Sequence, residues 1–438
     1  MADSNAGRIV ARRYTFWGLL NLLAGGPLLA LLAAYDATVD GTLSLRYPIF
    51  GTHSWVVLMG WCVPVTFALV FWLLPILKDL GQVRYGAIYN VCLGLLIAPT
   101  LGLGAYLVLA HLALPALFLL PIVWALFLVA AIIYATIVWR VCARTLRPTA
   151  SDIGLLSGAI WLVVVMIVRV ITALGAVATN RHDFLASSEP AVIMAMMFGF
   201  LGNTGLALAS AIGPEFLMTS HARPTVATAF RIYNTAVAVW AGGALWVLPV
   251  PYGLGRLLLA ISGFLLAYAA VRLLVELRLL DLLLLRANSA RRRLTRTALG
   301  AAAVLLLLAV GATALIGLWI GGTMSGAPQA MVTLPMHLMV AGFFSCVVIG
   351  LYVPLLGPRS LRGIRLPLAY AGYVLTLLWL LGRLGLAIME IVSDEPFWFE
   401  RYYAGWSIAA GALCLALWLV LAMWSARPAP ASSSPHSQ

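Results

Sequence analysis

Charged residues are scarce in this chain: they make up 9% of its 438 residues, whereas 63% are hydrophobic and the mean hydropathy is +1.03. A water-soluble domain does not have this balance. Runs of about 20 apolar residues, the length that a membrane-spanning helix needs, follow one another almost end to end. The short alternating strands of a β-barrel are missing. We therefore expect an all-α polytopic membrane protein.

Cysteine is also rare, and no CxxC or CxxCH motif occurs, which argues against covalently attached c-type haem and against a zinc knuckle. No Walker motif, Rossmann glycine fingerprint, HExxH or nucleophile elbow stands in a suitable context. The net charge of +13 does not indicate nucleic-acid binding, because the basic residues fall in short loops between apolar runs. The five cysteines are scattered: Cys62, Cys92, Cys142, Cys346 and Cys414.

About twelve apolar segments are long enough to span a membrane. The loops between them are short and leave no room for a soluble domain, so we expect one membrane domain over residues 1–426. The tail 427–438 is rich in Pro, Ala and Ser and is predicted to be disordered. The spans lie near 14–35, 55–77, 85–110, 114–139, 153–177, 190–213, 227–250, 254–275, 297–320, 331–356, 366–391 and 402–424.

Basic residues are concentrated in alternate loops, and this asymmetry predicts the orientation. By the positive-inside rule both termini lie in the cytoplasm. The protein is then expected in the inner (plasma) membrane of a prokaryote. The loops on the N-terminal side hold Lys78, Arg84, Arg140, Arg144, Arg147, Arg278, Arg286, Arg291, Arg292, Arg293, Arg296, Arg359, Arg362 and Arg365. The opposite side holds fewer: Arg46, Arg181, Arg256 and Arg401.

A glycine followed by an aromatic residue recurs in spans 2, 6 and 10, each time with a proline fifteen or sixteen residues later. The interval of 139 to 143 residues predicts three units of four helices, near 14–140, 153–280 and 297–424. Glycine lets another helix or a flat ligand approach closely, and the proline is expected to end the helix. The motifs are Gly60-Trp61 with Pro75, Gly199-Phe200 with Pro214, and Gly342-Phe343 with Pro358.

Two of the six histidines differ from the rest: His53 opens span 2, and His337 lies six residues into span 10, so both are expected near the outer ends of their helices. An imidazole within a membrane needs a partner. Each could simply link two helices through a hydrogen bond, as polar membrane residues often do. Their comparable positions in the repeat favour a second interpretation, in which both bind one metal or haem iron.

These features resemble subunit I of the haem–copper oxidase superfamily, with the C-type cytochrome oxidases and nitric oxide reductases as the most similar branch. The stretches HSWVVLMGWCVPVTFALVFWLLP and MHLMVAGFFSCVVIGLYVPLLG resemble that family's second and tenth helices. The resemblance implies that His53 and His337 hold a low-spin haem b (heme b). It also implies arginines beside the haem propionates, for which Arg46 and Arg401 are the candidates.

The chain departs from this family at the positions of its oxygen- or NO-reducing centre. Pro335 stands where a second histidine of helix 10 would bind a high-spin haem, and spans 6 and 7 contain no histidine for copper. The resemblance therefore implies that the binuclear centre is lost. Methionines of span 6 could bind Cu(I), but their helical spacing is typical of packing and argues against copper. They are Met194, Met196 and Met197.

Two further arginines, Arg169 in span 5 and Arg383 in span 11, lie within the membrane and require partners, for which Glu390 is one candidate. No catalytic residue is predicted, and whether the protein is an enzyme stays open.

The resemblance implies an electron-transfer protein of the respiratory chain. It would exchange electrons with a periplasmic cytochrome c, a cupredoxin or a quinone, beside other membrane subunits. One alternative is a divergent terminal oxidase or nitric oxide reductase. Another is a haem- or copper-handling membrane protein of the nitric-oxide-response type, or a transporter.

Overall fold

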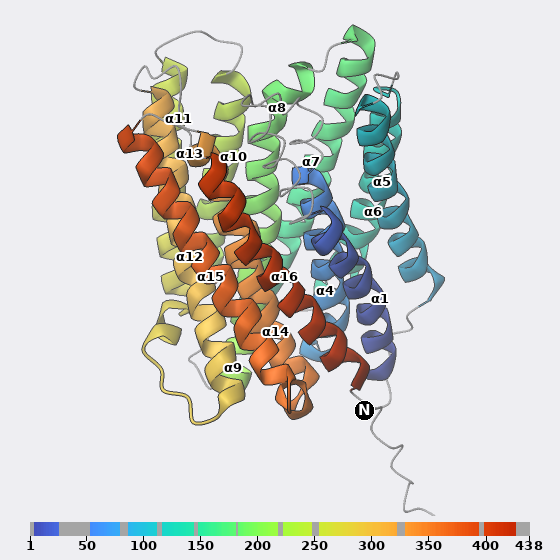
Figure 1. The fold of residues 1–438 in the computed structure, drawn as a ribbon, viewed down its shortest axis with the longest axis vertical. Helices are drawn as coiled ribbons and strands as arrows, with labels where there is room; N and C mark the ends of the chain where they lie inside the picture. Colours follow the sequence, from blue (N-terminus) through green and yellow to red (C-terminus); the bar gives the residue numbers. More distant parts are fainter. Residues whose placement is uncertain are drawn as a thin grey trace, which may run out of the picture.

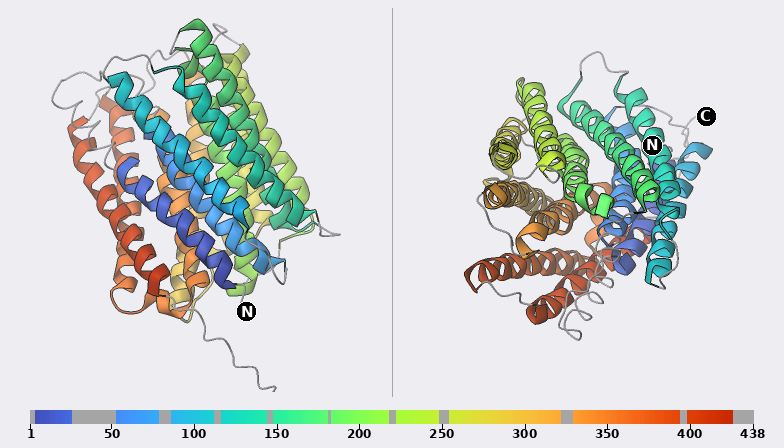
Figure 2. Two further views of the ribbon diagram at one scale, coloured as in Figure 1. Left: turned by 90° about the vertical axis from the view of Figure 1, so that its right-hand side faces the viewer. Right: turned by 90° about the horizontal axis from the view of Figure 1, so that it is seen from above.

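The chain folds as a bundle of long helices that run along a common direction, as the computed structural model shows (Figure 1). Seen from above, the helices follow one another around the bundle in chain order (Figure 2, right). The last helix contacts the first and so closes the ring. The structure describes residues 4–25, 53–78, 86–111, 116–143, 148–180, 183–217, 222–247, 254–321, 329–393 and 398–425.

Ten helices of the described residues are long and apolar enough to cross a membrane, which confirms a multi-pass, all-helical membrane protein. The count of twelve spans and the cytoplasmic termini stay predictions. The helices are α1 (Ser4–Leu23), α4 (Val63–Leu77), α5 (Ala87–His111), α6 (Leu119–Cys142), α7 (Ala150–Thr179), α8 (Asp183–Met194), α9 (Asn203–Leu217), α10 (Val226–Val247), α11 (Leu254–Glu276), α12 (Ala290–Gly321), α13 (Gln329–His337), α14 (Ser345–Leu356), α15 (Arg365–Ser393) and α16 (Trp398–Ser425).

Three composite helices occupy the interior, and they correspond to the predicted spans 2, 6 and 10. We call them the second, sixth and tenth helices; they contain α4, α8–α9 and α13–α14. In the most apolar part of each, 100%, 100% and 83% of residues are buried, against at most 61% in the other spans. The outer helices instead expose large apolar side chains such as Leu101, Ile171 and Leu381, as expected of a surface that faces lipid.

Each interior helix contains a π-helical segment that holds one of the three Gly-aromatic pairs. The segments are η2 (Val56–Cys62), η3 (Ala195–Gly202) and η5 (Leu338–Phe344), and η5 contacts both of the others. Such segments are rare and occur mostly where a helix is adapted to a particular contact. Their shared position supports the interpretation of the chain as a repeat, which stays a prediction.

The glycines of these pairs are close to side chains of neighbouring helices. A Cβ atom on Gly60 would lie 2.7 Å from Asn21 of α1, and one on Gly199 would lie 2.5 Å from Trp161 of α7. On Gly342 it would lie 2.8 Å from Leu380 of α15. Of the two roles expected for these glycines, close approach of another helix is therefore the one observed.

The prolines of the repeat do not all end their helices. Pro75 lies inside α4, which continues to Leu77, and Pro214 lies inside α9. Both are near the last turn, where loss of one backbone hydrogen bond disturbs the helix least. Only Pro358 follows a helix end, after Gly357 with its positive φ of 73°.

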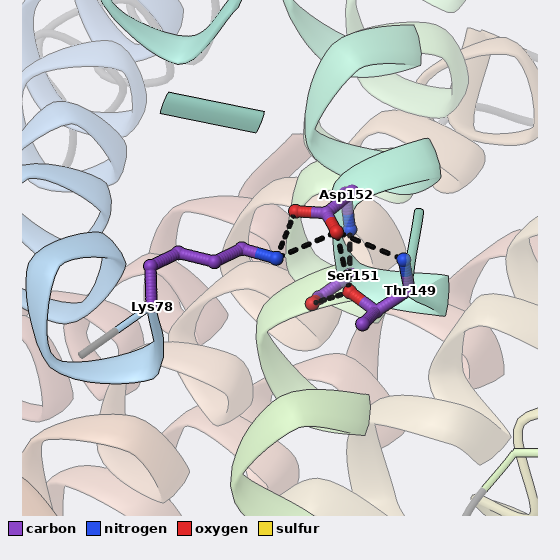
Figure 3. Close-up of polar contacts among 4 residues, drawn as sticks. All are labelled: Lys78, Thr149, Ser151 and Asp152. Carbon is purple, nitrogen blue, oxygen red and sulfur yellow. Dashed lines mark hydrogen bonds and ion pairs between the residues drawn. The ribbon is translucent and has the colours of Figure 1, made fainter. Parts of the chain in front are cut away.

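A buried ion pair joins the end of α4 to the start of α7 (Figure 3). Lys78 Nζ lies 2.6 Å from Asp152 Oδ1, with side chains 8% and 0% exposed. Asp152 also accepts hydrogen bonds from Thr149, whose hydroxyl in turn caps α7. The Asp152 carboxylate thus accepts hydrogen bonds from the N-cap residue of α7 and also pairs with Lys78 at the end of α4.

Replacement of Gly199 by Ala is expected to lower the free energy of unfolding by about 1–3 kcal/mol, because the new methyl group would collide with the Trp161 ring. Gly94 in α5 is the matched control, since a Cβ there meets nothing within 4 Å. Gly94→Ala should be neutral or stabilise by up to about 1 kcal/mol. Thermal unfolding of the detergent-solubilised protein measures both, and equal effects would contradict the close packing.

Candidate functional site

His53 and His337 lie beside the π-helical segments of two interior helices. His53 begins the described part of the second helix, and His337 is the last residue of α13, directly before η5. They precede their Gly-aromatic pairs by seven and five residues, so they are not strictly equivalent in the repeat. The offset of two residues amounts to about 3 Å along a helix axis. The two imidazoles therefore belong to nearly the same level of the bundle.

Both histidines line one cavity of about 90 Å³. Its walls come from α1, the second and tenth helices, α15 and α16, so it lies where the end of the chain meets its beginning. The lining is mostly apolar, with Trp61 and Trp379 among it and Thr376 as one of its few polar groups besides the histidines. A concave apolar site with few convergent polar groups is the usual form of a ligand pocket.

A hydrogen bond fixes the tautomer of His53. Its Nδ1 lies 2.7 Å from the carbonyl oxygen of Gly25, just after α1. A carbonyl oxygen can only accept, so Nδ1 carries the proton and Nε2 keeps its lone pair. Metal-binding histidines commonly use their second nitrogen in this way, which fixes the ring and leaves the other nitrogen available as a ligand.

The His337 ring packs edge-on against Trp379 of α15, with ring centroids 4.9 Å apart and planes at 78°. One turn beyond Trp379, Arg383 donates to Thr333 Oγ1 at 3.1 Å, and Thr333 lies one turn before His337. Arg383 thus links α15 to α13 near the cavity, although it is not among the residues that line it.

The two arginines predicted to bind propionates are not placed. Arg46 lies outside the described residues, and so does the side chain of Arg401, although its backbone belongs to α16. Their proximity to the histidines stays a prediction. Glu390 belongs to α15, but the partner of Arg169 is a different carboxylate.

Arg169 pairs with Glu189, which lies in α8 at the start of the sixth helix. The Arg169 Nη1 atom is 3.5 Å from Glu189 Oε2. The guanidinium carbon also lies 4.6 Å from the ring centroids of both Trp55 and Trp124. Trp55 Nε1 donates to Glu189 Oε1 at 2.6 Å. We call these four residues the Arg169 cluster; each desolvated cation–π contact of this kind contributes about 2 kcal/mol.

The Arg169 cluster is not evident from the sequence. Glu189 stands directly before Pro190, at which the predicted span 6 begins. An acidic residue next to an apolar run, in a chain with an unpaired membrane arginine, is the signal that could have identified it. Trp55 is one of fifteen tryptophans and carries no distinguishing pattern.

The polar residues of the sixth helix and α10 bind one another. Asn203 donates to the Gly199 carbonyl at 2.6 Å and to Asn234 Oδ1 at 2.9 Å, and Asn234 also accepts from Trp161. Tyr233 donates to the Phe198 carbonyl at 3.0 Å. Two of these bonds satisfy carbonyls of the η3 segment. The side chains of Asn203 and Tyr233 therefore stabilise the π-helical segment η3.

The three methionines considered as copper ligands belong to the same part of the sixth helix. Met196 and Met197 are fully buried within η3, and Met194 is 7% exposed. They pack in the hydrophobic core, the role that their helical spacing favoured.

Comparison with known proteins gives no relative: no protein-family model matches the chain, and no curated protein matches it.

Replacement of Arg169 by Met is expected to lower the free energy of unfolding by about 3–5 kcal/mol, because Glu189 would stay buried without its cation. The double variant Arg169→Met/Glu189→Gln should recover part of this loss, since no unpaired charge remains. Arg13, which is exposed, is the control, and Arg13→Met should cost less than about 1 kcal/mol. Thermal unfolding in detergent measures the three; losses that simply add in the double variant would contradict the pairing.

Proposed function

We propose that the protein is a membrane-embedded haem b protein that transfers electrons, with His53 and His337 as the two axial ligands of one low-spin iron. The observation that carries the proposal is that imidazoles from two helices far apart in sequence line one cavity. A structural link between two helices would need no such space beside the rings.

The residues around the cavity fit a porphyrin. The His53 Nδ1 atom is committed to the Gly25 carbonyl, so Nε2 is the nitrogen available to a metal. Apolar walls with indole rings suit a flat apolar macrocycle and exclude water. Haem held by two neutral imidazoles supplies reversible one-electron chemistry without an open position for oxygen.

This chain's own residues would then orient the ligand and exclude water. Trp379 restricts rotation of the His337 ring through its edge-on contact, and the Gly25 carbonyl does the same for His53. The electron donor and acceptor are proposed to be a periplasmic cytochrome c, a cupredoxin or a quinone, and the membrane is proposed to be the inner membrane of a prokaryote.

The purified protein should have sharp reduced haem b absorption bands that carbon monoxide does not shift, because both axial positions are filled. A shift with carbon monoxide would instead indicate an open position, and so the oxidase or nitric oxide reductase alternative. A colourless protein that also fails to bind added haem would overturn the proposal and favour a transporter.

His53→Ala and His337→Ala should each reduce haem content by more than the roughly 10- to 100-fold that loss of a residue merely supporting a ligand costs. His111, the last residue of α5, provides the control, and His111→Ala should keep its haem. The haem-to-protein ratio of the purified variants measures this. Full haem content in either ligand variant would contradict bis-histidine ligation.

A further inference from the structure

His53 and Trp55 belong to the same turn of the second helix. The bond from the His53 Nδ1 atom to the Gly25 carbonyl restrains the imidazole from one side. A second restraint on the same turn would fix the direction in which the ring faces.

Trp55 provides this restraint on the opposite side of the same turn. It follows His53 by two residues, a rotation of roughly 200° around the helix, so its indole points away from the cavity. The side chain is 1% exposed, and its Nε1 donates to Glu189 Oε1 at 2.6 Å. Trp55 is not among the residues that line the cavity.

Glu189 is itself held in place from α7. Arg169 lies 3.5 Å from its second oxygen and packs against the Trp55 and Trp124 rings. The Trp55 and Trp124 rings contact each other at 73° with centroids 4.8 Å apart. The Trp55 indole therefore donates to Glu189 and packs against Trp124 and Arg169. Rotation of the indole would break these contacts.

We propose that Glu189 is a positioning residue for His53, which acts through its hydrogen bond to the Trp55 indole and sets the orientation in which the imidazole faces the cavity. This inference rests on the proposed function, because it concerns the geometry of one of the two iron ligands. Glu189 is not among the residues that line the cavity, so its effect travels through the turn that His53 and Trp55 share.

Trp55→Phe tests the inference with the smallest change, since it removes the indole N–H while it keeps an aromatic ring beside Arg169. The orientation of the two imidazole planes determines the electron paramagnetic resonance spectrum of low-spin ferric haem. We expect that spectrum to change and haem loss to become roughly tenfold faster. Trp124→Phe is the matched control: Trp124 touches Arg169 in the same way but belongs to α6 and makes no bond to Glu189. It keeps an aromatic ring against Trp55 and should change both properties less than Trp55→Phe does.

Glu189→Gln separates the hydrogen bond from the charge. Its amide oxygen can still accept from Trp55, so we expect a wild-type spectrum and a wild-type rate of haem loss. If Trp55→Phe does not accumulate, the variants Arg169→Met/Glu189→Leu and Arg169→Met/Glu189→Gln test the same point. Neither leaves a buried unpaired charge, and only the first removes the acceptor of Trp55, so only the first should change the spectrum. A changed spectrum in Glu189→Gln, or equal effects of Trp55→Phe and Trp124→Phe, would overturn the positioning role. A wild-type protein without haem would overturn the proposed function itself.

Discussion

The interior of a membrane offers no water, so every buried polar group of this chain must find its partner within the bundle. The second helix meets this requirement at both ends. Near one end, His53 and Trp55 bond to Gly25 and Glu189. At the other, Lys78 is paired with Asp152. Three different neighbouring segments thus fix this helix along and around its axis, and the orientation of His53 is a consequence.

The two sides of the second helix are packed differently. On one side α5, α6, α7 and the sixth helix lie nearby, and the Arg169 guanidinium fills the space between two indoles. On the other side, towards α1, the tenth helix, α15 and α16, a cavity of about 90 Å³ remains. Close packing is the rule in protein interiors, and the proposed haem would account for a cavity that is lined by two imidazoles.

Most of the helix boundaries could be predicted from the sequence, because apolar length and polar interruptions determine them. Span 5, expected at 153–177, is observed as Ala150–Thr179. Side-chain partners could not be predicted in the same way. The interior helices are apolar on every side, so periodicity does not reveal their rotation. The sequence also does not reveal which helices are neighbours, and this decides that Arg169 of α7 meets Glu189 of α8 rather than Glu390 of α15. The π-helical segments likewise depend on tertiary contacts, although their Gly-aromatic pairs are visible in the sequence.

The distribution of polar groups limits where chemistry can occur within the described interior. Asn203 and Asn234 saturate each other and a carbonyl of η3, and Arg169 and Glu189 neutralise each other against two rings. His53 differs, because its one described hydrogen bond uses Nδ1 and directs the basic Nε2 away from that bond. On the proposed function, this difference explains why the space beside His53 stays open while the opposite side of the second helix is filled. The paired amides and charges join neighbouring helices, and in the proposed function the His53 Nε2 atom is the one that binds the iron.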